Sequence, residues 1–210
     1  MPELPEVETV RASLEPALIG RRFERVEILD SRLVRPDEPH EVAGELGGEV
    51  VASVERRGKY LVIRFESGRV LLVHLRMTGS FRLGANGSAS ADPHVRAVVA
   101  LDDGSDVAYR DVRRFGTWRL LEPGELVPYL DARLGAEPLA RAFTARALGE
   151  RLAGRRTSLK AALLDQRSLA GLGNIYVDEA LWRARLHPMR AAGELEPAEL
   201  RRLLRGIRSA

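Results

Sequence analysis

Hydrophobic positions in the first twenty residues recur at helical spacing. Leu4, Val7, Leu14 and Leu18 fall on one face of a helix, and glutamates occupy its first turn, where the helix dipole favours negative charge. Gly20 ends the pattern, as glycine commonly does after a last helical turn. The sequence therefore predicts one helix at the start of the chain.

From residue 23 to residue 121 the pattern changes to short β segments. Turn sequences at Ser67-Gly68 and Asp103-Gly104 separate neighbouring segments, and the small polar residues 84–93 predict a mobile loop within the β region. Many short strands at such spacing are typical of an antiparallel sandwich or barrel. The expected strands are residues 23–29, 50–55, 60–65, 70–75, 81–83, 95–101, 106–110 and 117–121.

Beyond residue 138 the pattern is helical throughout. Proline and glycine are frequent in residues 122–138, where the strands stop, which predicts a boundary there. The expected fold class is α+β, with an N-terminal helix on an antiparallel β-sandwich, followed by an all-helical domain. The expected division is a domain of residues 1–125, a linker of 126–138 and a helical domain of 139–210. Its expected helices are residues 144–152, 158–165, 174–186 and 196–207.

Composition narrows the class of protein. The chain has 210 residues and no cysteine, which excludes disulfides, thiolate nucleophiles and cysteine-ligated zinc within this sequence. The longest apolar runs are strand-sized, far short of the roughly 20 residues of a membrane helix. The acidic N-terminus is unlike a basic signal peptide. We therefore expect a cytoplasmic protein that does not engage a membrane.

Charge is unevenly distributed along the chain. Residues 1–130 carry a formal charge of about −3 and residues 131–210 about +6, within a total of +3. A basic C-terminal third suggests a polyanion as partner. Only two of the 33 cations are lysines, Lys59 and Lys160, an arginine bias that genomic base composition also explains.

The N-terminus offers a candidate nucleophile. Removal of Met1 would expose the secondary amine of Pro2, and an α-amino group with a pKa near 7.7–8.0 is partly neutral at physiological pH. Such an amine can attack an electrophilic carbon to form an iminium ion. Glu3 and Glu6, one helical turn apart, could donate or accept its protons. Taken alone, these residues favour an ordinary helix start, where proline and glutamate are common.

Five sequence blocks together resemble the bacterial formamidopyrimidine-DNA glycosylase family. They occur in the family's order and span nearly the whole chain. The related endonuclease VIII branch usually begins PEGPE and lacks the RRFG block, so the likeness is to the formamidopyrimidine branch. The blocks are MPELPEVETVR at the start, RRGKYL at 56–61, HLRMTG at 74–79, DVRRFGTW at 111–118 and DQRSLAGLGNIYVDEALW at 165–182.

The resemblance implies a base excision repair enzyme. It would remove oxidised purines such as 8-oxoguanine and formamidopyrimidines and cleave the abasic site by β,δ-elimination through a Schiff base on Pro2. The implied catalytic residues are Pro2, Glu3, Glu6 and Lys59, with Glu3 protonating the opening sugar ring. The lesion must leave the base stack to be reached. Lys59 and His74 would hold the phosphates beside the flipped nucleotide.

The remaining implied residues bind DNA. Met77, Arg113 and Phe115 match the family's trio that fills the gap left by the flipped nucleotide, although core packing alone would also account for Met77 and Phe115. Strand alternation from residue 70 predicts Arg76 on the same face as His74, where a solvated strand surface is an equal interpretation.

In the helical part, Gly171 and Gly173 precede a helix that begins at Asn174, a pattern that resembles the helix-two-turn-helix DNA-binding element. Free backbone N–H groups at such a start attract anions, and Asn174 would either cap the helix or bind a phosphate. Lys160 matches a family lysine directed at the phosphate or base of the lesion.

The sequence departs from the family in one large respect. Family members normally continue into a lesion-capping loop and a C-terminal zinc finger with four cysteines, and this chain ends before both, so we expect no zinc or other cofactor in it. The expected partner is double-stranded DNA with an oxidised purine or abasic site, bound by a monomer. A non-catalytic DNA-binding remnant, and an abasic-site lyase without base excision, are the alternative functions. A small-molecule enzyme or interaction domain would require the motif blocks to be coincidence.

Overall fold

The computed structural model describes residues 2–85 and 92–210. The chain divides into two compact units, Met1–Leu126 and Val127–Ala210. Within the loop expected at 84–93, residues 86–91 lie outside the described part of the chain, as does Met1. The predicted fold class is confirmed, because antiparallel sheets build the first unit and helices the second.

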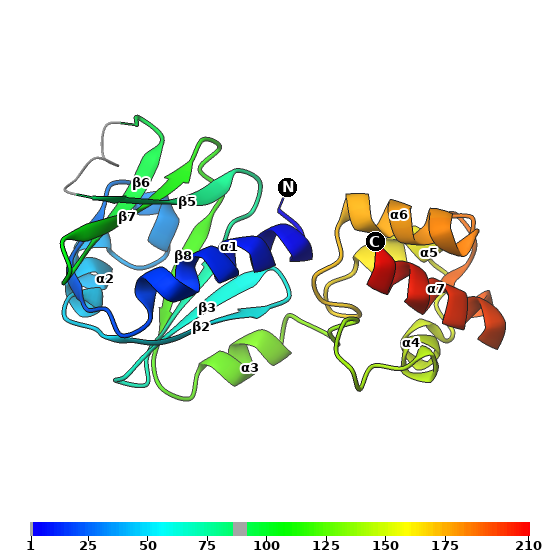
Figure 1. Ribbon diagram of the computed structural model, residues 1–210. Coiled ribbons are helices and arrows are strands. Elements are labelled where there is room, and N and C mark those ends of the chain that lie inside the picture. The colour runs from blue at the N-terminus through cyan, green and yellow to red at the C-terminus, as the bar shows by residue number, and fades with distance from the viewer. Residues whose placement is uncertain (1, 86–91) are drawn as a thin grey trace. The chain divides into compact units, whose positions relative to one another are not determined.

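The first unit contains two four-stranded antiparallel sheets, shown in Figure 1. One has the strand order β1-β6-β7-β5 and the other the order β2-β3-β4-β8. Alternating residues of β6 are buried, as one inward-facing side of a strand requires, whereas every residue of β4 is buried. The strands are β1 (Phe23–Ile28), β2 (Val51–Arg57), β3 (Tyr60–Phe65), β4 (Val70–His74), β5 (Gly79–Ala85), β6 (Val95–Leu101), β7 (Ser105–Asp111) and β8 (Thr117–Leu121).

Helix α1 (Leu4–Leu18) lies along the sandwich and contacts β2, β3 and β5 (Figure 1). Its buried side chains are the four leucine and valine positions of the predicted stripe: Leu4, Val7, Leu14 and Leu18. Val7, Leu14 and Leu18 join the core cluster of the first unit, which includes the fully buried Tyr109. Burial of this stripe fixes the position of the N-terminus on the sandwich.

Two short helical segments of the first unit were not predicted. The 3-10 helix η1 (Ser31–Val34) is capped by Asp30, whose side chain accepts a hydrogen bond from the backbone N–H of Arg32 at 3.1 Å. Helix α2 (Pro39–Leu46) follows it, with proline in its first turn and Val42 and Leu46 buried. These segments connect β1 to β2.

The second unit is helical. Thr144 and Ser158 cap α4 and α5 by accepting hydrogen bonds from backbone N–H groups three residues ahead. Gly206 of α7 packs closely on α6, since a Cβ there would lie 2.6 Å from the carbonyl oxygen of Ala180. The helices are α3 (Leu126–Asp131), α4 (Ala145–Leu152), α5 (Leu159–Leu164), α6 (Asn174–Ala184) and α7 (Pro197–Ser209), with a 3-10 turn η3 (Ala192–Glu194).

Two local expectations differ from the structure. Part of the segment expected to be a linker, residues 126–138, is the helix α3. Strand β4 ends at His74, and Arg76 lies in the following turn with φ +54°, so the alternation that placed Arg76 on the face of His74 was wrong. Among the helices in the described ranges, none has the length and apolar character to cross a membrane.

Candidate functional site

The start of α1 holds two glutamates in a fixed arrangement. The backbone N–H of Glu3, the N-cap residue, donates a hydrogen bond to Oε2 of Glu6 at 2.9 Å, one half of a capping box. Glu3 is 2% exposed, whereas Glu6 is exposed. Pro2 precedes them and is half-buried. The candidate nucleophile, Pro2, is therefore joined by a peptide bond to a buried residue, Glu3, whose side chain carries a carboxyl group.

Lys59 lies in the turn between β2 and β3, where Gly58 adopts a left-handed φ of +58°. Its side chain is buried, with only 6% exposed. Burial lowers the pKa of Lys59, and the negative charges of Glu3 and Glu6 partly oppose that shift. Two segments distant in sequence thus bring an ammonium group into the field of both glutamates.

His74 ends β4 opposite Tyr60 of β3, and the two rings meet edge to face with centroids 4.7 Å apart. Its Nδ1 accepts a hydrogen bond from the backbone N–H of Arg76 at 3.0 Å. Burial, followed by the positive charges of Arg76 and Lys59, lowers the pKa of His74 to about 3. The imidazole is therefore neutral at physiological pH, and its remaining proton, on Nε2, is a hydrogen-bond donor.

A buried carboxylate joins two loops at one end of the sandwich. Asp111, 1% exposed, accepts a hydrogen bond from the Thr78 hydroxyl and another from the backbone N–H of Gly116 at 2.7 Å. Thr78 in turn accepts one from the backbone N–H of Arg113 at 3.0 Å. The loop after β4 and the loop after β7 are therefore held together.

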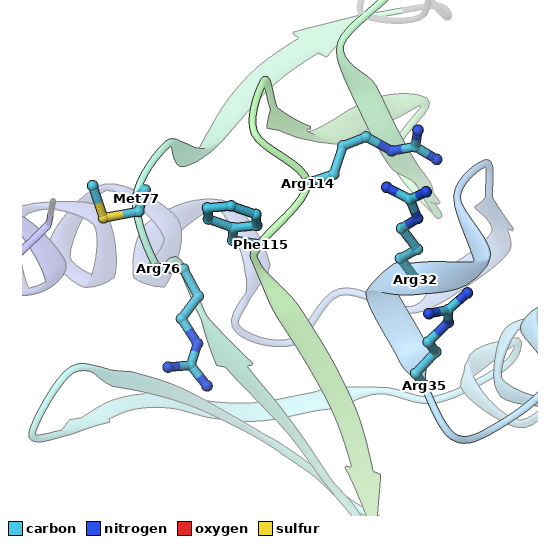
Figure 2. A pocket seen from close by; sticks show the side chains of 6 residues that line it. All are labelled: Arg32, Arg35, Arg76, Met77, Arg114 and Phe115. Carbon is cyan, nitrogen blue, oxygen red and sulfur yellow. The ribbon is translucent and has the colours of Figure 1, made fainter.

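Three predicted site residues lie on these two loops. The Arg113 guanidinium carbon lies 4.8 Å from the centre of the Phe115 ring, within cation–π range. Phe115 is 52% exposed, which excludes core packing as its role, and Met77 is half-buried on the neighbouring loop. Figure 2 shows Met77 and Phe115 side by side on the two loops. Together the three side chains form a tip, and we use that name for Met77, Arg113 and Phe115.

An open pocket of about 680 Å³ borders this tip. Sequence reasoning missed Arg32 and Arg35, because they belong to the unpredicted segment η1 and its C-cap, and no motif marks them. The sequence offered one signal: Arg32 and Arg35 lie three residues apart, shortly after Asp30. The pocket is lined by Arg32, Arg35, Arg76, Met77, Arg114 and Phe115 (Figure 2).

The second unit contains the other two predicted residues. The Lys160 ammonium forms an ion pair with Asp178 of α6, at 2.7 Å from Oδ1 and 2.8 Å from Oδ2. Asn174 is exposed at the first residue of α6, and the N-cap is Gly173, so of the two roles expected for Asn174 the structure excludes capping, and phosphate binding stays a prediction. Gln166 holds the preceding loop, because its Oε1 accepts a hydrogen bond from the backbone N–H of Gly171 at 2.9 Å.

No group of three or more histidine, aspartate or glutamate side chains in residues 2–85 and 92–210 is arranged to hold a metal ion. The chain has no cysteine from which to build the family's four-cysteine finger. A four-cysteine zinc site therefore cannot form from the residues of this sequence.

Family comparisons cover both units. Residues 1–118 match the family model described as the formamidopyrimidine-DNA glycosylase N-terminal domain. Residues 134–210 match the formamidopyrimidine-DNA glycosylase H2TH domain, which agrees with the predicted helix-two-turn-helix element.

Individual relatives agree with the family models. A formamidopyrimidine-DNA glycosylase of Symbiobacterium thermophilum is 52% identical over 97% of this chain and 66% of its own length. That of Bacillus subtilis is 44% identical over 97% of this chain and 74% of its own length. The chain thus spans about two thirds to three quarters of these relatives.

Solved structures show the same fold. A Lactococcus lactis Fpg variant in complex with a Fapy-dG containing DNA superposes with a TM-score of 0.92, at 36% identity over 99% of this chain and 76% of that chain. A MutM complex with carbocyclic 8-oxo-G containing DNA gives a TM-score of 0.92 at the same identity, over 99% of this chain and 77% of that chain.

Proposed function

Because the chain belongs to the formamidopyrimidine-DNA glycosylase family, we propose that it excises oxidised purines from DNA and cleaves the resulting abasic site. The observation that carries this proposal is that Glu3, which directly follows Pro2, is buried and acts together with Glu6 on the charge of the buried Lys59. The proposed partner is double-stranded DNA that contains 8-oxoguanine, a formamidopyrimidine or an abasic site, bound by a monomer in the cytoplasm.

In the first step, the neutral amine of Pro2 attacks C1′ of the flipped nucleotide. The nitrogen lone pair forms the new bond, the glycosidic bond breaks, and the base departs with its electron pair. Glu3 donates a proton to the sugar ring oxygen as the ring opens, which leaves an iminium ion on Pro2. Glu3 suits this role because it directly follows Pro2 in the chain and is only 2% exposed.

β,δ-Elimination from this iminium then cleaves the strand on both sides of the sugar. Each elimination removes a proton from the sugar and expels a phosphate, so the site must both accept and donate protons. Glu3 carries the protons, and Glu6 keeps the start of α1 in place through its bond to the Glu3 backbone. Lys59 balances the negative charge of the two glutamates and binds a phosphate of the damaged strand.

The other site residues hold the DNA. The neutral His74 donates Nε2–H to a phosphate, and Lys160 and Asn174 supply further contacts from the helical unit. The tip enters the gap left by the flipped nucleotide, where Met77 and Phe115 replace its stacking and Arg113 bonds the orphaned base. An exposed ring beside a guanidinium supports this role.

Borohydride trapping tests the proposal. Protein shown by mass spectrometry to begin at Pro2 should form a covalent adduct with an 8-oxoguanine:cytosine duplex in the presence of borohydride. Protein that retains Met1 is the matched control, because the nitrogen of Pro2 is then part of a peptide bond and the free amine belongs to Met1. Adducts with abasic DNA alone would indicate a lyase without base excision. Salt-dependent duplex binding with no adduct to either DNA would contradict the proposed chemistry.

A further inference from the structure

Arg32, Arg35 and Arg76 line one pocket with exposed side chains. Several other arginines of the same unit are ion-paired: the Nε atoms of Arg64 and Arg110, for example, lie 2.9 and 2.6 Å from carboxylates. Within residues 2–85 and 92–210, no carboxylate pairs with the guanidinium of any of these three pocket residues. The pocket is therefore a concentration of uncompensated positive charge.

Two of these arginines, Arg32 and Arg35, lie on one particular side of the tip. Figure 2 shows Arg32 and Arg35 on one side of Phe115 and Met77 on its other side. In the same view the start of α1, which carries the candidate catalytic residues, lies on the Met77 side of Phe115. The start of α1 and the pair Arg32 and Arg35 thus flank the tip from opposite directions.

A wedge inserted into a duplex has one strand on each side. The strand with the flipped nucleotide lies toward the catalytic residues, so the other strand lies toward Arg32 and Arg35. Guanidinium groups bind phosphate oxygens through paired N–H donors and are the usual protein ligands of a nucleic-acid backbone. Arg32 and Arg35 come from one short segment, η1 and its C-cap, which spaces them along a single backbone.

From this arrangement we propose that Arg32 and Arg35 bind phosphates of the undamaged strand, opposite the lesion. The assignment rests on the proposed function, because it takes the tip to be the wedge. These contacts hold the second strand while the tip occupies the gap, and they make binding depend on the duplex. An abasic single strand has no partner for them.

The experiment compares the full chain with the double variant Arg32→Gln/Arg35→Gln. The probes are a duplex with a tetrahydrofuran abasic analogue and the same damaged strand alone. We expect the duplex affinity of the variant to fall roughly tenfold and its salt slope, log K against log salt, to decrease by about 2, one per lost phosphate contact. The ratio of duplex to single-strand affinity should fall by a similar factor.

A second double variant controls for net charge. Arg25→Gln/Arg64→Gln removes two exposed arginines from the same unit, each ion-paired at present, and should retain the wild-type ratio. Neutral methylphosphonate linkages opposite the lesion should weaken wild-type binding and leave the Arg32→Gln/Arg35→Gln variant almost unaffected. Thermal melting checks that all variants fold.

Equal losses in the two double variants would overturn the assignment. So would a methylphosphonate effect confined to the damaged strand. The proposed chemistry is judged separately, by the borohydride adduct of the wild-type protein with an abasic duplex. A wild-type protein that binds the duplex without forming an adduct would contradict the chemistry alone, while absence of any duplex binding would overturn both.

Discussion

Arg114 and Asp30 form a two-point ion pair that fastens the loop after β7 to the start of η1. Nε and Nη2 of Arg114 lie 2.5 and 2.9 Å from Oδ2 and Oδ1 of Asp30. The hydrogen-bonded guanidinium lowers the pKa of Asp30 against the opposing effect of its burial. Arg114 also has φ +60°, a left-handed conformation that costs free energy for any residue but glycine. Its neighbours Arg113 and Phe115 thereby lie on one side of the loop.

Loss of this ion pair should impair base excision more than abasic-site cleavage. In the variant Asp30→Asn the loop is released, and the tip fills the gap less effectively, so excision from an 8-oxoguanine duplex should slow several-fold. Cleavage of an abasic single strand requires no gap filling and should change less. Single-turnover rates on both substrates measure the difference, and equal slowing would show that Asp30 acts through overall folding.

The backbone conformation of Arg114 gives a second, independent prediction. Arg114→Gly and Arg114→Ala both remove the ion pair, but only glycine adopts φ +60° without strain. Arg114→Gly should therefore have the higher melting temperature of the two. The reverse order in thermal denaturation would contradict the left-handed conformation.

Gly116 should tolerate no side chain, because a Cβ there would lie 1.8 Å from the hydroxyl oxygen of Tyr109. Gly116→Ala should lower the free energy of unfolding by about 1–3 kcal/mol, the usual cost of overpacking. The Tyr109 hydroxyl is buried without a hydrogen-bond partner among the described residues. Tyr109→Phe should therefore preserve stability and reduce the cost of Gly116→Ala in the double variant, as urea denaturation can measure.

His74 should make the first unit sensitive to acid. Its pKa of about 3 in the fold lies below the ordinary value of 6.5, so the unfolded chain binds a proton first as pH falls. Stability is then lost progressively from about pH 6.5 toward pH 3, and the contribution between pH 7 and pH 5 is about 2 kcal/mol. The variant His74→Gln should lose less stability than the wild type over this interval.

Tryptophan fluorescence can report the pH-dependent unfolding of the first unit separately from that of the second. Trp118 is buried in the first unit and Trp182 is 77% exposed in the second, so a Trp182→Phe background leaves Trp118 as the reporter. Identical pH dependence with and without His74 would show that the imidazole is protonated normally in the fold.

Lys160 should bind DNA more strongly once its partner is removed. Its ion pair with Asp178 is partly exposed to solvent, with Lys160 at 30% and Asp178 at 51%, and contributes less than about 1 kcal/mol to stability. Asp178→Asn should leave the melting temperature almost unchanged and raise duplex affinity a few-fold at low salt. Glu179→Gln, which removes a neighbouring charge paired with Arg183, is the matched control and should have a smaller effect.

The periodicity of hydrophobic residues predicted the elements that bury a regular stripe of side chains. It did not predict short elements with only one or two buried residues, and it did not predict where a strand ends in a turn. Helix α1 was predicted over its full length because four apolar residues repeat over nearly four turns. Helix α2 buries only Val42 and Leu46, too few for a period, although the proline at its start was a signal. Strand alternation failed at Arg76 because the strand ends two residues earlier.

The candidate site shows the same limits. The family resemblance placed Glu3 and Lys59 in one catalytic set, but it did not predict that Lys59 is buried and that the charges of Glu3 and Glu6 act on it. Arg32 and Arg35 were missed because their importance depends on a pocket formed with loops more than forty residues away. Charge clusters of this kind arise from tertiary packing and have no local pattern.

Asp111 orders the tip in the free protein. One buried carboxylate holds both loops, so the backbone of the tip is ordered when the protein folds, and the conformational entropy of that backbone is not lost again on binding. In the proposed function, such a preorganised tip tests each base step that it meets by direct insertion. Lesion search would then be limited by how readily the duplex opens at a damaged pair, and not by rearrangement of the protein.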